Sequence, residues 1–280
     1  MTQALNRVLD RLGLGPDAPL IPLQGGDISE VYRVDTPHGR VVIKRAAPDI
    51  LRAERDGLAA LAAVPTQLEI PECLELDDDV LAMTWLSPGK PSDAKTRLLG
   101  EELRHLHTRS RATTHGWATT TFAGPTPQIN TSLENGADFL IEQRLRPLAE
   151  RCLRENKLPK QDARKLDALF ARVPGLLPNE PPCLVHGDLW HGNVFYTETG
   201  VALIDPAIHR HYAMFDLAML ALFSPTSTNF EQAYWDGPRP ETWPAQCALF
   251  QLYPLLNHLL LFGQSFLGEL QSKIKMLEKW

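Results

Sequence analysis

Three polar residues have the types and the spacing that phosphoryl transfer and magnesium binding require. Asp188 and Asn193 share one polar loop between apolar runs, and Asp205 comes at the end of a later apolar run. An aspartate and an amide on one loop can point separately at an acceptor hydroxyl and at Mg²⁺, while a carboxylate from the adjacent hairpin completes the metal's oxygen shell. The pattern predicts phosphoryl transfer from ATP, with Asp188 as base or orienting acceptor and Asn193 and Asp205 as magnesium ligands.

A cation and a carboxylate precede these residues. Lys44 ends an apolar run, and Glu54 follows in a segment of helical periodicity, from which it could orient the lysine. A glycine-rich connection, Gly25 and Gly26 followed by Ser29, comes before both and could supply backbone donors to phosphates. Each feature alone is weak, since such charges are usually solvated and two glycines usually mark a turn. Their order along the chain favours a kinase.

The histidine that opens the polar loop is predicted to support it. His186 follows the apolar run Cys183–Val185 and should therefore be buried, where its ring would fix the loop by hydrogen bonds. Asp188 already fills the acid–base role, so a second catalytic group is not required at this position.

The elements that must position these residues fall into two groups. We expect a β-rich N-terminal lobe over 1–86 and a larger, mainly helical C-terminal lobe over 87–280, which together make an α+β, bilobal, protein-kinase-like fold. The hydrophobic periodicity predicts helices at 5–12, 50–63, 92–109, 132–156, 160–173, 213–223 and 242–279, the last broken near 263, and strands at 20–23, 31–34, 41–44, 72–76, 80–84, 183–185, 193–196 and 201–204.

Composition excludes several other classes. The chain has 280 residues with 44% hydrophobic and 22% charged residues, as in globular proteins, and its net charge of -6 argues against nucleic acid as a partner. The longest apolar stretch, 249–262, is interrupted by polar residues and is too short to span a membrane. The N-terminus lacks an export signal, and four scattered cysteines suit reduced thiols, so a cytoplasmic monomer is expected.

Strings along most of the chain resemble the fructosamine kinase family, a branch of the aminoglycoside and choline kinase group. The most discriminating is IDPA at 204–207, because aminoglycoside and choline kinases generally carry other residues after the metal-binding aspartate. The similar strings are HGDLWHGN at 186–193, TPQ at 126–128 with Asn130, ADF at 137–139, EQRL at 142–145 and DLAM at 216–219.

This resemblance implies roles residue by residue. Lys44 would contact the phosphates with Glu54 as its partner, and Asp216 would brace the catalytic loop. Trp190 would form a wall against which the acceptor sugar packs, although burial in the core is an equally open interpretation. Backbone groups of the segment from Met83 to Leu86, which includes Thr84 and Trp85, would face adenine.

The family's activity would be ATP- and Mg²⁺-dependent phosphorylation of a ketoamine, a fructosamine or ribulosamine, at its C3 hydroxyl, which makes the sugar labile and leads to deglycation. The acceptor would be a small molecule or protein-bound. Two alternatives stay open, which are a kinase for another hydroxyl acceptor such as an aminoglycoside, choline or a sugar, and a non-catalytic nucleotide-binding module of kinase fold. The intact set of roles disfavours the second.

Three departures from the family pattern bear on the acceptor. Thr84 stands where many members have glutamate, His191 stands where serine is common, and the stretch 131–136 lacks a tryptophan often found there. The glycine-rich loop contains no cysteine, so no redox control through that loop is expected. The three departures affect acceptor preference rather than phosphoryl chemistry.

Overall fold

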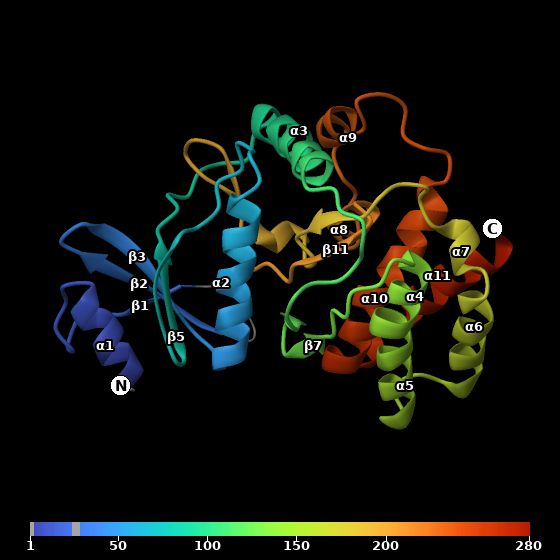
Figure 1. Ribbon diagram of the computed structural model, residues 1–280, viewed down its shortest axis with the longest axis horizontal. Coiled ribbons are helices and arrows are strands. Elements are labelled where there is room, and N and C mark those ends of the chain that lie inside the picture. The colour runs from blue at the N-terminus through green and yellow to red at the C-terminus, as the bar shows by residue number, and fades with distance from the viewer. Residues whose placement is uncertain (1–2, 24–28) are drawn as a thin grey trace.

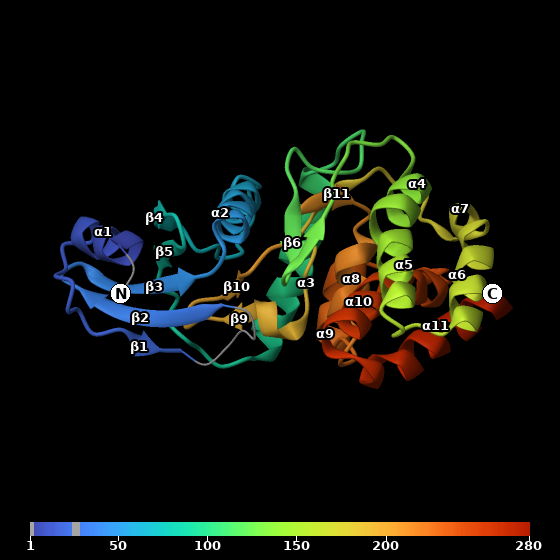
Figure 2. The same ribbon diagram turned by 90° about the horizontal axis from the view of Figure 1, so that it is seen from below.

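The N-terminal part of the chain is built on one antiparallel sheet with strand order β1-β2-β3-β5-β4 (Figures 1 and 2). The computed structural model describes residues 3–23 and 29–280, so Gly25 and Gly26 lie outside the described residues. The strands are β1 (Ile21–Pro22), β2 (Glu30–Thr36), β3 (Gly39–Arg45), β4 (Cys73–Asp77) and β5 (Val80–Thr84).

Two helices cover this sheet because its strands alternate apolar residues between the two faces. Helix α1 (Gln3–Arg11) packs on the face that carries Ile43, and helix α2 (Pro48–Ala62) packs on the face that carries Leu81. Figure 1 shows the sheet edge-on between them. Lys44 follows Ile43 in β3 and therefore points toward α2, which carries Glu54.

Helices dominate the rest of the chain, around one large apolar core. They are α3 (Asp93–Arg109), α4 (Gly136–Leu140), a π-helical turn (Ile141–Leu145), α5 (Arg146–Arg154), α6 (Lys160–Phe170), α7 (Val173–Leu176), α8 (Met214–Leu220), α9 (Thr228–Trp235), α10 (Trp243–Phe262) and α11 (Leu267–Lys279), with 3₁₀ turns at His191–Asn193 and Gln264–Phe266. The predicted α+β class, with a β-rich N-terminal lobe and a larger, mainly helical C-terminal lobe, is confirmed.

Helix α10 is the core element of this part. It is the one described helix that is long and apolar enough to cross a membrane, and 78% of its most apolar window is buried inside the fold. It continues through Pro254, and it ends at Gly263, whose φ of 89° stops the helix and separates it from α11 as the sequence predicted. The buried core helix expected at 249–262 is thus confirmed.

Three two-stranded antiparallel sheets lie between the helices, and two of them hold the polar loop. Strand β8 (Cys183–Val185) pairs with β11 (His209–His211), and β9 (Val194–Tyr196) pairs with β10 (Val201–Leu203). The third, β6 (Thr121–Ala123) with β7 (Thr126–Gln128), was not predicted. The helix predicted at 132–156 begins later, at Gly136, because the Asn135 side chain accepts hydrogen bonds from the first turn.

The two parts meet along the β9–β10 hairpin. Glu69, in the segment after α2, pairs through its backbone with β10, and Gly89, after β5, donates to the Tyr196 carbonyl in β9 at 2.8 Å. The boundary proposed between 86 and 87 falls between β5 and α3, within a segment that itself contacts this hairpin. The N-terminal lobe and the segment that follows it therefore both rest on the element that leads into Asp205.

Three neutral histidines are buried behind the polar loop. The Nδ1 atoms of His115 and His211 are 2.8 Å apart, so one ring donates and the other accepts, and the His209 ring lies beside His211. Burial lowers the pKa of His115 to about 4 and holds the pKa values of His209 and His211 well below the usual value.

We expect this cluster to make the fold sensitive to acid. A histidine whose pKa is depressed in the folded state is neutral there while the unfolded chain binds a proton, so stability is complete above pH 6.5 and falls as the pH approaches 4. Between pH 7 and pH 5, His115 alone should cost about 2 kcal/mol of unfolding free energy. Urea unfolding at both pH values measures this, and His115→Gln should flatten the dependence. Equal stabilities of the parent at pH 7 and pH 5 would contradict it.

Candidate active site

The polar loop leaves β8 through a sharp turn at Gly187. This residue has a φ of 81°, and a Cβ there would collide with the carbonyl of Ala207, so glycine is required by both the backbone and the space. The Ala207 N–H donates to the His186 carbonyl at 2.8 Å, which ties the loop to the segment that follows Asp205.

His186 lies beneath the loop and is fully buried. Its Nε2–H donates to the Ile204 carbonyl at 2.9 Å, and its Nδ1 accepts from the Asp188 N–H at 3.3 Å. Because a carbonyl can only accept, these contacts assign the Nε2–H tautomer. The ring thus links the residue before Asp205 to the backbone of Asp188, as a supporting residue would.

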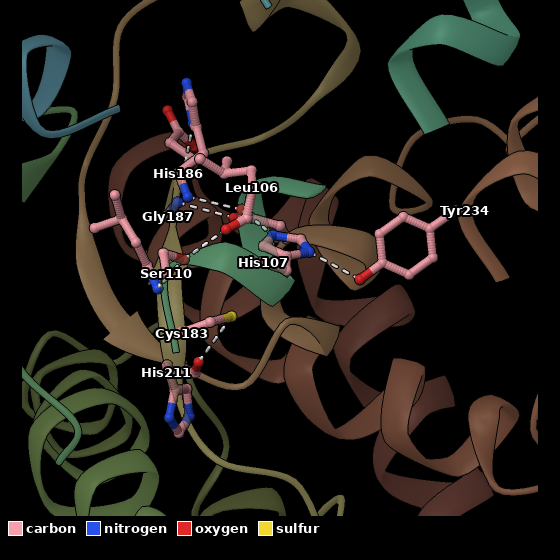
Figure 3. A network of polar contacts seen from close by, with 11 residues as sticks. Leu106, His107, Ser110, Cys183, His186, Gly187, His211 and Tyr234 are labelled. Atoms are coloured by element: carbon pink, nitrogen blue, oxygen red, sulfur yellow. Dashed lines mark hydrogen bonds and ion pairs between the residues drawn. The ribbon is translucent and has the colours of Figure 1, made fainter. Parts of the chain in front are cut away.

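Asp216 holds the first turn of the loop from below. Its carboxylate accepts from the N–H groups of His186 at 2.7 Å and Gly187 at 2.9 Å, and from His107 Nε2 at 3.2 Å. Figure 3 shows His107 between the His186–Gly187 turn and Tyr234, whose hydroxyl donates to His107 Nδ1 at 2.8 Å. Asp216 is fully buried, so it contacts the loop and not a bound ligand.

Asp188 and Asn193 face each other across the loop. The Asn193 amide nitrogen donates to the Asp188 carbonyl at 2.7 Å and to its carboxylate at 3.3 Å. This leaves the Asn193 side-chain oxygen free of that pair. Burial, together with the Asp205 charge, raises the pKa of Asp188 to about 7, which suits a group that must accept a proton near neutral pH.

Lys44, Glu54 and Asp205 form one charge cluster between the two parts, in which Lys44 and Glu54 are buried and Asp205 is partly exposed. Lys44 Nζ lies 2.7 Å from Glu54 Oε2 and 2.8 Å from Asp205 Oδ1. Burial opposes the lysine's charge, but the two carboxylates outweigh it and raise the pKa of Lys44. The residues therefore come together from β3, α2 and the end of β10, although 161 positions separate Lys44 from Asp205.

The two carboxylates differ in exposure and charge. Glu54 is 6% exposed at its side chain, and desolvation raises its pKa to about 7 despite Lys44. Its Oε1 is buried with no hydrogen-bond partner among the described residues. Burial also opposes ionisation of Asp205, but the Lys44 ammonium outweighs it and lowers the pKa of Asp205, whose side chain remains 43% exposed. Asp205 is thus the ionised and accessible carboxylate.

The donor set fits magnesium. Asp205 offers an exposed carboxylate oxygen and Asn193 an amide oxygen, both hard ligands, and Mg²⁺ keeps several waters beside one or two protein ligands. Among residues 3–23 and 29–280, no group of three or more His, Cys, Asp or Glu side chains is arranged to hold a metal.

The residues predicted around adenine lie at the end of β5. The Met83 side chain is buried between α2 and the sheet. Thr84 is committed to Glu72, because its N–H donates to the Glu72 carbonyl and its hydroxyl accepts the Glu72 N–H. Trp85 has its indole nitrogen buried without a partner among the described residues. Ser29 is half-buried directly before β2.

Trp190 is an exposed residue and not a core tryptophan. Its side chain follows Asp188 by two positions, and the residue is 41% exposed. The indole lies directly over Gly192, where a Cβ would collide with the ring, and meets the Phe223 ring edge-on at 6.3 Å between centroids. The ring is therefore held in place while one side stays open to solvent.

The mid-chain strings form a buried hydrogen-bond network. Gln128 donates to the Tyr253 hydroxyl at 2.8 Å, and Thr126 donates to Asn257 at 2.6 Å, so both tie the β6–β7 hairpin to α10. Arg144, fully buried, donates to the Ile129 carbonyl at 2.7 Å, and its guanidinium lies over the Phe139 ring. Burial lowers the pKa of Arg144 to about 10. These contacts join the β6–β7 hairpin, the segment after it and α10 into one buried unit.

One positioning contact was not foreseen from the sequence. Helix α2 rests on the segment after Asp205 at Gly57, where a Cβ would lie 2.9 Å from Pro206 Cγ and 3.5 Å from Ile208 Cγ2. The contact sets the distance between Glu54, one helical turn earlier, and Asp205. A glycine inside a predicted helix was the available signal, since it weakens the helix unless close packing requires it.

We expect Gly57→Ala to lower kcat/KM for ATP by about tenfold, because the methyl group pushes α2 and Glu54 away from Lys44 and Asp205. Pro206→Ala in the same chain should restore activity by removing the ring carbon that clashes. Gly268→Ala in α11, where nothing lies within 4 Å, is the matched control. Steady-state kinetics with varied ATP measures all four proteins, and a double variant no better than Gly57→Ala would refute the contact's role.

Fold and site together define a phosphotransferase of the protein-kinase-like class. A family model described as fructosamine kinase matches residues 16–279. A probable ketoamine kinase of Thermus thermophilus is 35% identical over 271 residues, which cover 95% of this chain and 97% of the relative. The chain belongs to the fructosamine kinase family, and the resemblance drawn from its sequence is confirmed.

More distant relatives agree. Ketosamine-3-kinase of Mus musculus is 27% identical, with 91% of this chain and 93% of the relative covered. The crystal structure of a candidate fructosamine-3-kinase from Thermobifida fusca has a TM-score of 0.89 and 31% identity, covering 98% of this chain and 99% of that one. An ADP-bound aminoglycoside phosphotransferase has a TM-score of 0.66 at 14% identity over 99% of both chains, a likeness in fold alone.

Proposed function

We propose that this protein transfers the γ-phosphoryl group of ATP to a hydroxyl of a ketoamine, at C3 of a fructosamine or ribulosamine. The observation that supports this most directly is the convergence of Lys44, Glu54, Asp188, Asn193 and Asp205 on one site in a chain of the fructosamine kinase family. The names of the relatives from Thermus thermophilus and Mus musculus support the ketoamine as acceptor class.

The residues divide the work of this reaction. Asp188 orients the acceptor hydroxyl and takes its proton as the new oxygen–phosphorus bond forms and the bond to ADP breaks. Lys44, held by Glu54, binds the phosphates. Asn193 and Asp205 would hold Mg²⁺, which neutralises phosphate charge when bound. His186 and Asp216 position the loop and do not touch the reacting atoms.

The remaining assignments concern the nucleotide and the setting of the protein. Backbone groups near Met83, Thr84 and Trp85 receive adenine, and Ser29 with the glycine-rich connection covers the phosphates. The net charge of -6 supports a protein without nucleic-acid partners. A monomer in the cytoplasm that acts on free or protein-bound ketoamines completes the proposal.

A substrate panel tests it. Purified protein should release ADP from Mg-ATP with fructosyl-lysine and ribulosyl-lysine and not with an aminoglycoside or choline, and phosphorus NMR should place the phosphate at C3. Release with choline or the aminoglycoside alone would replace the acceptor class and leave the phosphoryl chemistry standing. If none of the acceptors gives ADP release while ATP still binds, the protein is better described as a nucleotide-binding module.

A further inference from the structure

Exposed aromatic rings gather beside the catalytic loop. Three of the eight large hydrophobic residues that are exposed in the described chain belong to this cluster, which are Trp190 at 41%, Phe223 at 49% and Phe262 at 50%. They come from the loop, from the segment after α8 and from the end of α10. Isolated exposed apolar residues are normal on a protein surface, but a contiguous group next to a site calls for a ligand.

The rings form a continuous row that begins at the site. The Trp190 ring meets Phe223 at 6.3 Å, Phe223 meets His258 at 5.3 Å, and His258 meets both Phe262 at 5.5 Å and Phe266 at 4.9 Å. We call these five residues the aromatic row. Phe266 packs against the core and anchors its far end. The first ring packs over Gly192 and the last packs against the core, so both ends of the row are held in place.

The row also has one polar feature. His258 Nδ1–H donates to the Pro254 carbonyl at 2.6 Å, and burial lowers the pKa of His258, so its Nε2 is an unprotonated acceptor within the row. None of the five side chains carries a charge at neutral pH. An occupant should therefore present flat apolar surface and a hydrogen-bond donor, not a carboxylate or an ammonium group at this position.

The row is longer than the sugar requires. A sugar ring has about the area of one indole and would cover Trp190 alone, while the rings from Phe223 to Phe262 extend past it. In a ketoamine whose reacting hydroxyl lies at Asp188, the group beyond the sugar is the amine on which the sugar formed. The rings beyond Trp190 begin with Phe223, which meets the Trp190 ring edge-on, so they continue directly from the ring assigned to the sugar.

We infer that the aromatic row is a binding subsite for the amine-side group of the acceptor, and that it selects ketoamines whose amine carries an apolar or aromatic group with an N–H donor. This inference rests on the proposed function, since it takes the sugar to lie on Trp190. It assigns acceptor preference to Phe223, His258 and Phe262, residues that do not take part in phosphoryl transfer.

Paired acceptors that share a sugar test the subsite. Nα-benzoyl-fructosyl-lysine should have a KM about tenfold lower than fructosyl-lysine with the parent protein, with similar kcat. The Phe223→Ala/Phe262→Ala variant should lose this preference by raising KM for the benzoyl acceptor alone. Trp280→Ala, at another exposed aromatic residue, is the matched control and should retain the preference. Equal losses for both acceptors, or no loss for either, would overturn the inference.

A binding measurement separates this inference from the proposed function. Saturation-transfer NMR with unglycated Nα-benzoyl-lysine needs no turnover, and its signal should be strong with the parent and with Trp280→Ala and weak with the double variant. That result together with no turnover of any ketoamine would remove the proposed reaction and keep the subsite. Equal signals from the parent and the double variant would remove the subsite, whatever the kinase assay shows.

Discussion

Asp188→Ala is expected to lower kcat by about 10²- to 10⁴-fold, the range in which a positioned general base contributes. The affinity for Mg-ATP should change little, because Lys44 and Asp205 are paired with each other and Asn193 keeps its 2.7 Å hydrogen bond to the Asp188 backbone carbonyl, which the substitution does not remove. Steady-state turnover with fructosyl-lysine, alongside a nucleotide-binding titration, measures both quantities.

One companion variant makes this result interpretable. Asp188→Asn keeps the shape of the side chain but cannot accept the hydroxyl proton, so it should lose nearly as much turnover as the alanine variant. The half-buried carboxylate has a pKa raised to about 7 by burial, so its neutral replacement should not destabilise the fold at pH 8. Near-parental kcat in the asparagine variant would remove Asp188 from the reaction.

The parts of the site that the sequence predicted are those whose signals are local. The apolar runs before His186 and Asp205 set short strands next to polar residues, and such a juxtaposition is costly unless the polar groups are used. Lys44 and Glu54 could be paired in advance because a strand followed directly by a helix brings them to neighbouring elements. Lys44 and Asp205 could be assigned to one site although they are far apart in the sequence, because each stands at the end of a predicted strand.

Other elements lacked a local signal. The β6–β7 hairpin has strands of three residues, TFA and TPQ, which are too short for alternation and contain Pro127, a residue that disfavours strands. Helix α9 has a weakly amphipathic sequence and is fixed by packing on α3, where Gly100 allows its backbone to come close. Their positions follow from tertiary contacts that propensity does not contain.

The aromatic row shows the same limit at the site. Trp190, Phe223 and His258 come from a loop, a connection and a helix, and each alone reads as an ordinary residue of its element. Only the fold places the three rings in succession. The same holds for Gly57 and Pro206, since a glycine in a helix and a proline after Asp205 gain their meaning from touching each other.

The second large effect is expected at Lys44. Lys44→Met removes the cation from the phosphates and should lower kcat/KM for ATP by about 10²- to 10³-fold, the loss typical of one preorganised electrostatic contact. The fold should survive, because the pKa of Glu54 is about 7 even beside the lysine, so the buried carboxyl takes up a proton when the lysine is gone. Lys275→Met, at an exposed lysine in α11, is the matched control.

A double-mutant cycle then separates the roles of Lys44 and Glu54. If Glu54 acts only by holding Lys44, Glu54→Gln should cost about tenfold alone and almost nothing once Lys44 is methionine, since coupled residues are not additive. Their 2.7 Å contact and the burial of Glu54 favour this outcome. Losses that multiply in the double variant would mean that Glu54 acts on the nucleotide or its metal ion by itself, through the Oε1 atom that has no hydrogen-bond partner in the described part of the chain.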